Sequence, residues 1–126
     1  MQVVHKHLLA KAEVKSAPKN YRTLNDWLTR LVASIDMKIC IEPRSIYVDE
    51  PGNKGLTGQV GIETSHIAIH IWDECSPAVV QMDVYSCKEF DESIIPKFLD
   101  EWGLVNYESL LIDRSGKGFS ILEVTH

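Results

Sequence analysis

Apolar residues recur at helical spacing in one segment of the first third of the chain. Successive members lie three or four positions apart. An α-helix completes a turn in about 3.6 residues, so this spacing places all of them on one face. The pattern predicts a helix of about four turns with a single buried face. The residues that form the stripe are Leu24, Trp27, Leu28, Leu31, Val32 and Ile35.

Other segments alternate between apolar and polar residues, which is the period of a β-strand. Pro43 within one of them indicates an edge strand or a bend, because proline cannot donate a hydrogen bond to a neighbouring strand. Asp49–Gly58 is interpreted as a loop because it concentrates turn-forming residues, and Asp73–Pro77 as the turn of a hairpin. The predicted strands are Val3–Val14, Lys38–Val48, Gln59–Glu63, His66–Trp72, Val79–Cys87, Leu110–Asp113 and Phe119–Val124.

A second helix is predicted after Asp91 or Ser93, since either residue type caps helices well. Pro96 is tolerable in its first turn, and Gly103 marks its end. Two helices are too few to cover both faces of the sheet. We therefore expect an α+β fold, a two-layer sandwich in which a mostly antiparallel sheet carries both helices on one face. The apolar residues of the second helix are Ile94, Ile95, Phe98, Leu99 and Trp102.

Length, charge and cysteine content narrow the possible functions. The chain has 126 residues, 44% hydrophobic and 25% charged, which fits one domain spanning residues 1–126. A formal net charge of −5 does not favour a nucleic-acid partner. The absence of a long apolar run or a signal-peptide core favours a cytoplasmic protein without membrane attachment. Cys40, Cys75 and Cys87 lack the spacing of a disulfide framework or a structural zinc site.

Reactive side chains gather between residues 55 and 87, within apolar strands. A metal site on His66 and His70 is disfavoured, because four residues of strand separate them by about 13 Å, and no metal is expected. A serine hydrolase is disfavoured as well, since Ser65 lacks the Gly-x-Ser-x-Gly turn. The third interpretation is a serine that modifies its own chain.

Hairpin geometry gives the third interpretation a partner for the serine. If the chain folds back near Cys75, Cys87 lies opposite residues 63–65, so a thiol stands beside Ser65 as a possible acid or base. His70 lies about 16 Å from Ser65 along an extended strand and on the opposite face. If both serve one site, we expect them to come from different subunits of a symmetric dimer.

Three segments resemble the signature of a known family, the short prokaryotic S-adenosylmethionine decarboxylases. That signature reads E-S-H-[IL]-x-I-H-T-W-P-E, followed by D-[VL]-F-T-C-G and preceded by G-[VL]-[ST]-G. The resemblance spans most of the chain, at a similar total length. The matching segments here are Gly55-Leu56-Thr57-Gly58, Ser65-His66-Ile67-Ala68-Ile69-His70 with Trp72-Asp73-Glu74, and Asp83-Val84-Tyr85-Ser86-Cys87.

The resemblance implies a proenzyme that cleaves itself between Thr64 and Ser65. Ser65 then becomes a pyruvoyl group at the new N-terminus, so no metal or added cofactor is needed. In the family, this group forms a Schiff base with the substrate amine and accepts electrons as carbon dioxide departs. The implied activity is decarboxylation of S-adenosylmethionine, which supplies polyamine (spermidine) biosynthesis.

The resemblance also assigns roles to individual residues. His70 matches the proton acceptor of self-processing, and Thr57 stands where a serine assists that step. Cys87 matches the proton donor in decarboxylation, and Glu74 matches the residue that binds the ribose hydroxyls of the substrate. Family members are homodimers with composite sites, in which Ser65 and Cys87 would come from one subunit and His70 and Glu74 from the other.

Departures from the family pattern leave two alternatives open. Thr64 replaces the usual glutamate before the processed serine, which favours an unprocessed, non-catalytic homologue that acts as a binding partner. The family has a substrate-binding aromatic residue before Gly55, whereas here Tyr47 is the nearest ring and Asp49 and Glu50 follow it. Carboxylates at this place favour a decarboxylase of ornithine, arginine or another basic amino acid.

Overall fold

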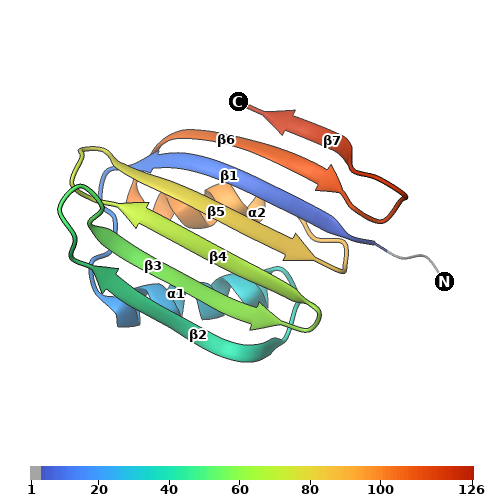
Figure 1. Ribbon diagram of the computed structural model, residues 1–126, viewed down its shortest axis with the longest axis horizontal. Coiled ribbons are helices and arrows are strands. Elements are labelled where there is room, and N and C mark those ends of the chain that lie inside the picture. The colour runs from blue at the N-terminus through green and yellow to red at the C-terminus, as the bar shows by residue number, and fades with distance from the viewer. Residues whose placement is uncertain (1–3) are drawn as a thin grey trace.

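A computed structural model describes residues 4–126 as an antiparallel seven-stranded sheet with both helices on one face (Figure 1). The strand order is β2-β3-β4-β5-β1-β6-β7, which confirms the predicted α+β sandwich. Val3, the first residue of the first predicted strand, lies outside the described residues. The elements are β1 (Lys6–Val14), α1 (Tyr21–Ser34), β2 (Ile39–Val48), β3 (Gly55–Ile62), β4 (Ser65–Trp72), β5 (Ala78–Ser86), α2 (Ile94–Leu99), the 3₁₀ helix η1 (Asp100–Trp102), β6 (Leu104–Asp113) and β7 (Ser120–Thr125).

The predicted apolar stripe of α1 is buried against the sheet. The Asn20 side chain begins the helix by accepting a hydrogen bond from the backbone N–H of Arg22 at 2.8 Å. Trp27 is fully buried and stacks on Trp102 with ring centroids 4.4 Å apart, while its indole N–H donates to the Phe98 carbonyl at 3.2 Å. These contacts join α1 to the second helical segment over one core. Within residues 4–126, no helix combines the length and apolar character needed to cross a bilayer.

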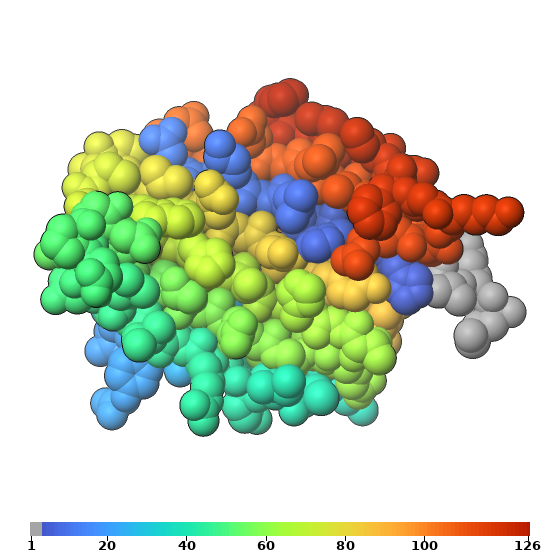
Figure 2. Space-filling view, in the orientation of Figure 1, coloured from blue at the N-terminus to red at the C-terminus, as the bar shows by residue number. Residues whose placement is uncertain are grey.

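The two faces of the sheet differ in character because side chains alternate along each strand. On β4 the residues that face the helices are buried, with Ile67 and Ile69 fully inaccessible, whereas His66 and His70 on the other face are exposed. Figure 2 shows this second face, which no helix covers. We call it the open face of the sheet.

The predicted loop over Asp49–Gly58 is wrong in its second half, because β3 begins at Gly55. The glycines that suggested a turn serve close packing instead. Gly55 has φ +147°, and a Cβ there would lie 1.8 Å from the Ile71 carbonyl oxygen. A Cβ on Gly58 would lie 2.6 Å from Ser45 Oγ. These two glycines let neighbouring chain segments approach the strand.

Two other predicted boundaries also differ from the structure. β6 begins at Leu104 rather than at Leu110, because pairing with β1 extends it through a segment that carries no clear alternation of its own. The second helix is α-helical only over Ile94–Leu99 and ends as a 3₁₀ turn before Gly103, whose φ is +74°. Ser93 precedes this helix without a side-chain capping bond.

The prediction that Pro43 marks an edge or a bend is confirmed. β2 is an edge strand of the sheet, and its pairing with β3 is irregular between Ile41 and Arg44, around the proline.

Candidate active site

The turn between β3 and β4 holds its last residue in a strained conformation. Thr64 has φ +54°, a left-handed conformation that a β-branched residue rarely adopts. Such a conformation costs on the order of 1–3 kcal/mol and persists only where the surrounding structure imposes it. Ser65 follows as the first residue of β4 and is only 9% exposed. The strained residue therefore immediately precedes the serine singled out by the sequence.

Cys87 contacts both Thr64 and Ser65, the two residues joined by the candidate cleavage bond, as the hairpin geometry predicts. Its backbone N–H donates to Ser65 Oγ at 3.0 Å, and the Thr64 hydroxyl donates to Cys87 Sγ at 2.7 Å. The cause is the β4–β5 register, which pairs His66 with Tyr85 and so continues toward Cys87 beside the turn. Ser65, Thr64 and Cys87 form one group, which we call the serine–thiol cluster.

Hydrogen bonding in the serine–thiol cluster lowers the pKa of the Cys87 thiol. The Ser65 hydroxyl is the largest cause and the Thr64 hydroxyl the next, while partial burial of the thiol acts in the opposite direction. Both hydroxyls stabilise the thiolate more than the thiol. The cluster thus lets Cys87 ionise at a lower pH than an unperturbed cysteine thiol.

Thr64→Val is expected to raise the pKa of Cys87, because valine keeps the shape of threonine and removes the hydroxyl that donates to Sγ. The pH at which Cys87 becomes reactive toward iodoacetamide then moves upward, and alkylation at neutral pH slows. The comparison is made in a Ser65→Ala background, which keeps the peptide bond intact. Mass spectrometry of the alkylated peptide gives the rate.

The matched control for this measurement is Thr29→Val, in which the lost hydroxyl donates to the Asn25 carbonyl within α1 rather than to the thiol. Its alkylation profile at Cys87 is expected to follow that of the Ser65→Ala parent. Identical profiles for Thr64→Val and the parent would show that the Thr64 hydroxyl does not stabilise the thiolate.

His70 and Thr57 form a second group, on the open face. They are paired across β3 and β4, and Thr57 Oγ1 lies 3.1 Å from His70 Nδ1. A hollow of about 610 Å³ in the open face is lined by His70 together with residues of β1, β5, β6 and β7. His70 is accessible there, and the Thr57 hydroxyl orients its ring.

The structure does not bring His70 to Ser65 within one chain. The two residues are five positions apart on β4, with Ser65 on the helix-covered face and His70 on the open face. An extended strand separates positions this far apart by about 16 Å. The serine–thiol cluster and the Thr57–His70 pair are therefore two half-sites.

Glu74 and Asp49, two further candidates, bind parts of the loop that precedes β3. Glu74 Oε1 accepts the backbone N–H groups of Gly52 and Lys54 at 2.9 and 3.2 Å. Asp49 pairs with the Lys54 ammonium at 3.3 Å. Both carboxylates thus help to fix this loop next to the end of β4.

Tyr47, the aromatic candidate, bonds to a carboxylate that sequence reasoning missed. The Tyr47 hydroxyl donates to Asp73 Oδ1 at 2.9 Å, and this bond is the largest cause of a raised Tyr47 pKa. Asp73 Oδ2 is buried and has no hydrogen-bond partner among the described residues. A buried carboxylate oxygen of this kind favours a cationic partner. Only the departure from proline after Trp72 pointed to this position in the sequence.

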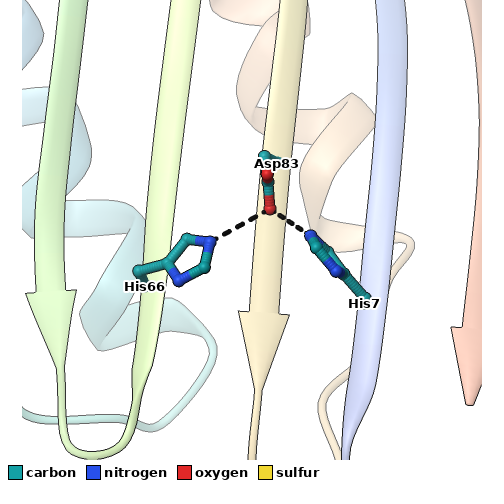
Figure 3. A group of neighbouring side chains, drawn as sticks. All are labelled: His7, His66 and Asp83. Carbon is teal, nitrogen blue, oxygen red and sulfur yellow. Dashed lines mark hydrogen bonds and ion pairs between the residues drawn. The ribbon is translucent and has the colours of Figure 1, made fainter. Parts of the chain in front are cut away.

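Three polar residues of the open face were also not foreseen as a group. Nothing in the sequence assigns a catalytic role to His66, and His7 is interpreted as a surface or sheet residue, yet both rings converge on Asp83 (Figure 3). No hairpin links β1 to β5, so the contact between His7 and Asp83 had no signal in the spacing.

Comparison with known proteins gives one consistent family. The family model described as S-adenosylmethionine decarboxylase matches residues 7–114. A Caldicellulosiruptor saccharolyticus protein named S-adenosylmethionine decarboxylase proenzyme is 25% identical over 115 residues, which cover 91% of this chain and 83% of the relative. A Clostridium kluyveri protein of the same name is 25% identical over 107 residues, which cover 85% of this chain and 75% of that relative. The residues matched by the family model include both half-sites.

Proposed function

Since the chain belongs to the S-adenosylmethionine decarboxylase family, we propose that it cleaves itself between Thr64 and Ser65 and then decarboxylates S-adenosylmethionine with a pyruvoyl group derived from Ser65. The product is the aminopropyl donor of spermidine biosynthesis. The observation that carries this proposal is the serine–thiol cluster, in which a strained threonine precedes a serine held against a cysteine.

Self-cleavage requires only groups of the chain and one water molecule. The Ser65 hydroxyl attacks the Thr64 carbonyl carbon, and the C–N bond breaks as an ester forms and the proton passes to the released amine. A base then removes the Ser65 α-proton, which expels the Thr64 carboxylate and leaves dehydroalanine. Water adds to this residue, and ammonia departs. The left-handed Thr64 supports the first step, because cleavage of the adjacent bond relieves its strain.

His70 is the proposed base in this sequence, and Thr57 positions it. An unprotonated imidazole nitrogen can accept a proton, and the Thr57 hydroxyl 3.1 Å from Nδ1 fixes the orientation of the ring. Because His70 lies on the face opposite to Ser65, the base acts on the serine of a second copy. We therefore propose a homodimer with two composite sites.

The open face offers a surface for this second copy. Its exposed apolar side chains include Leu9 and Val124, which line the hollow, and Ile46, which is paired with Thr57 across β2 and β3. A protomer packed over the open face would cover these side chains and bring its own Thr64–Ser65 turn toward His70.

The residues around Ser65 fit a pyruvoyl group. The precursor serine is nine-tenths shielded from water and stands at the start of a hydrogen-bonded strand, beside the Cys87 N–H donor. When formed, the group supplies a carbonyl that accepts the electron pair released as carbon dioxide leaves. Cys87 Sγ then donates a proton to the product carbon. The hydrogen bonds that lower the pKa of Cys87 make its thiol a stronger proton donor than an unperturbed cysteine.

Release of labelled carbon dioxide from carboxyl-labelled S-adenosylmethionine tests the proposed activity. We expect the unmodified protein to turn over and Ser65→Ala to show only background release. Ser120→Ala, which removes an exposed serine on β7, is expected to match the unmodified protein. A protein that is cleaved at Ser65 but releases no carbon dioxide from this substrate would contradict the proposed activity and retain the proposed processing.

A basic amino acid is the second candidate substrate, favoured by the orphaned Asp73 Oδ2 beside Tyr47. An ammonium group can donate a hydrogen bond to this oxygen, whereas the sulfonium of S-adenosylmethionine cannot. If ornithine or arginine is the substrate, labelled carbon dioxide is released from it alone, and Asp73→Asn raises KM more than it lowers kcat. Turnover of S-adenosylmethionine alone would exclude this candidate.

A further inference from the structure

Three side chains from neighbouring strands meet on the open face, and one of them, Asp83, also lines the hollow that His70 lines. His7 on β1, Asp83 on β5 and His66 on β4 project from the same side of the sheet (Figure 3). Tyr85 is paired with His7 on one side and with His66 on the other, so the two rings flank β5 in one row. Asp83 lies two residues along β5 and places its carboxylate between the rings.

The three side chains present their metal-binding atoms to one point. Asp83 Oδ1 contacts His7 Nε2 and lies 3.2 Å from His66 Nε2, and the three atoms are all within 4.8 Å of one another. The side chains of His7, Asp83 and His66 are 17%, 39% and 47% exposed, so the point is partly enclosed and open to solvent.

We propose that His7, His66 and Asp83 bind a divalent transition-metal ion of the zinc class. Two imidazole nitrogens and one carboxylate oxygen form a donor set that suits Zn²⁺, with a fourth position left for water. Strands joined by backbone hydrogen bonds hold the three Cα atoms at fixed spacing, so small side-chain rotations suffice to seat the ion. The expectation of no metal considered His66 with His70, which cannot converge, and not His66 with His7.

Arg114 is a positively charged side chain that disfavours metal binding at this site. Its Nη1 lies 3.1 Å from His7 Nδ1, and its guanidinium carbon lies 4.3 Å from the centre of the Tyr85 ring. A histidine bound to metal through Nε2 carries its proton on Nδ1, so it can no longer accept from Arg114. Metal binding must therefore break this contact and place the ion near a fixed positive charge. Removing Arg114 is expected to strengthen metal binding, which a histidine–aspartate pair without a metal role would not show.

Titration with Zn²⁺ against a chromophoric chelator measures the affinity. We expect one ion per chain, at least tenfold weaker binding in His66→Ala and in Asp83→Asn, and severalfold tighter binding in Arg114→Ala. His126→Ala is the matched control, because it removes another exposed histidine that pairs with a carboxylate, Glu108. Its affinity is expected to equal that of the unmodified protein.

Co²⁺ absorption identifies the ligands independently of affinity. We expect ligand-field bands without thiolate-to-cobalt charge transfer, because the proposed ligands contain no sulfur. The check is needed because the free thiols of Cys40, Cys75 and Cys87 offer other places for a metal ion to bind. Unchanged circular dichroism in His66→Ala shows that a loss of binding does not reflect unfolding. Equal Zn²⁺ affinity in His66→Ala, Asp83→Asn and the unmodified chain, or a charge-transfer band from sulfur, would overturn the proposal.

Discussion

Ser65→Ala is expected to leave the protein as one chain, whereas the unmodified protein is expected to separate into residues 1–64 and 65–126. The loss of cleavage should be complete, because alanine lacks the hydroxyl oxygen that attacks the Thr64 carbonyl. This oxygen belongs to the residue that becomes the pyruvoyl group, so no neighbouring side chain can replace it. Intact mass measured under denaturing conditions distinguishes the two outcomes. The second fragment should also resist N-terminal sequencing, because a ketoacyl group blocks it.

Folding and nonspecific proteolysis are controlled in the same experiment. Ser65 is nearly buried but small, so alanine adds no bulk, and circular dichroism should match that of the unmodified protein. Ser120→Ala removes an exposed serine and should cleave normally. A single full-length species from the unmodified protein would contradict self-processing and support a non-catalytic binding partner, as the replacement of glutamate by Thr64 allows.

The parts of the fold that could be predicted from sequence are those with a local cause. The stripe that includes Trp27 and Leu31 fixes both the helix and its buried face, and these residues are fully buried in the structure. By contrast, Gly55 and Gly58 look like turn residues until the backbone of β4 and the side chain of Ser45 are placed against them. Close packing between segments that are far apart in the chain produces no periodic pattern in the sequence, so these roles of the glycines could not be predicted.

The same distinction applies to the candidate site. Cys87 could be placed beside Ser65 because Ser65 begins β4 and Cys87 directly follows β5, and the one short hairpin that joins these strands sets their register. The contact of His7 with Asp83 requires the pairing of β1 with β5, between which α1, β2, β3 and β4 intervene. The orphaned oxygen of Asp73 requires knowledge of burial, which composition does not supply.

Coexpression of Ser65→Ala with His70→Ala is expected to restore cleavage that neither variant shows alone. In a mixed dimer, the His70→Ala chain keeps its serine, and its partner supplies the histidine. If the two chains pair at random, about half of the His70→Ala chains meet a Ser65→Ala partner and are cleaved. Distinct tags on the two chains allow mass spectrometry to assign the fragments.

The physical reason for this result is the distance within one protomer. Proton transfer requires the base within about 3 Å of its target, or one water molecule away. His70 lies on the opposite face of β4 from Ser65, about 16 Å along an extended strand, so it cannot reach the α-carbon of its own serine. Cleavage of the His70→Ala chain by itself would show that another group is the base. If neither the single variants nor the mixture were cleaved, while the unmodified protein was, His70 would act within its own chain and the composite site would be wrong.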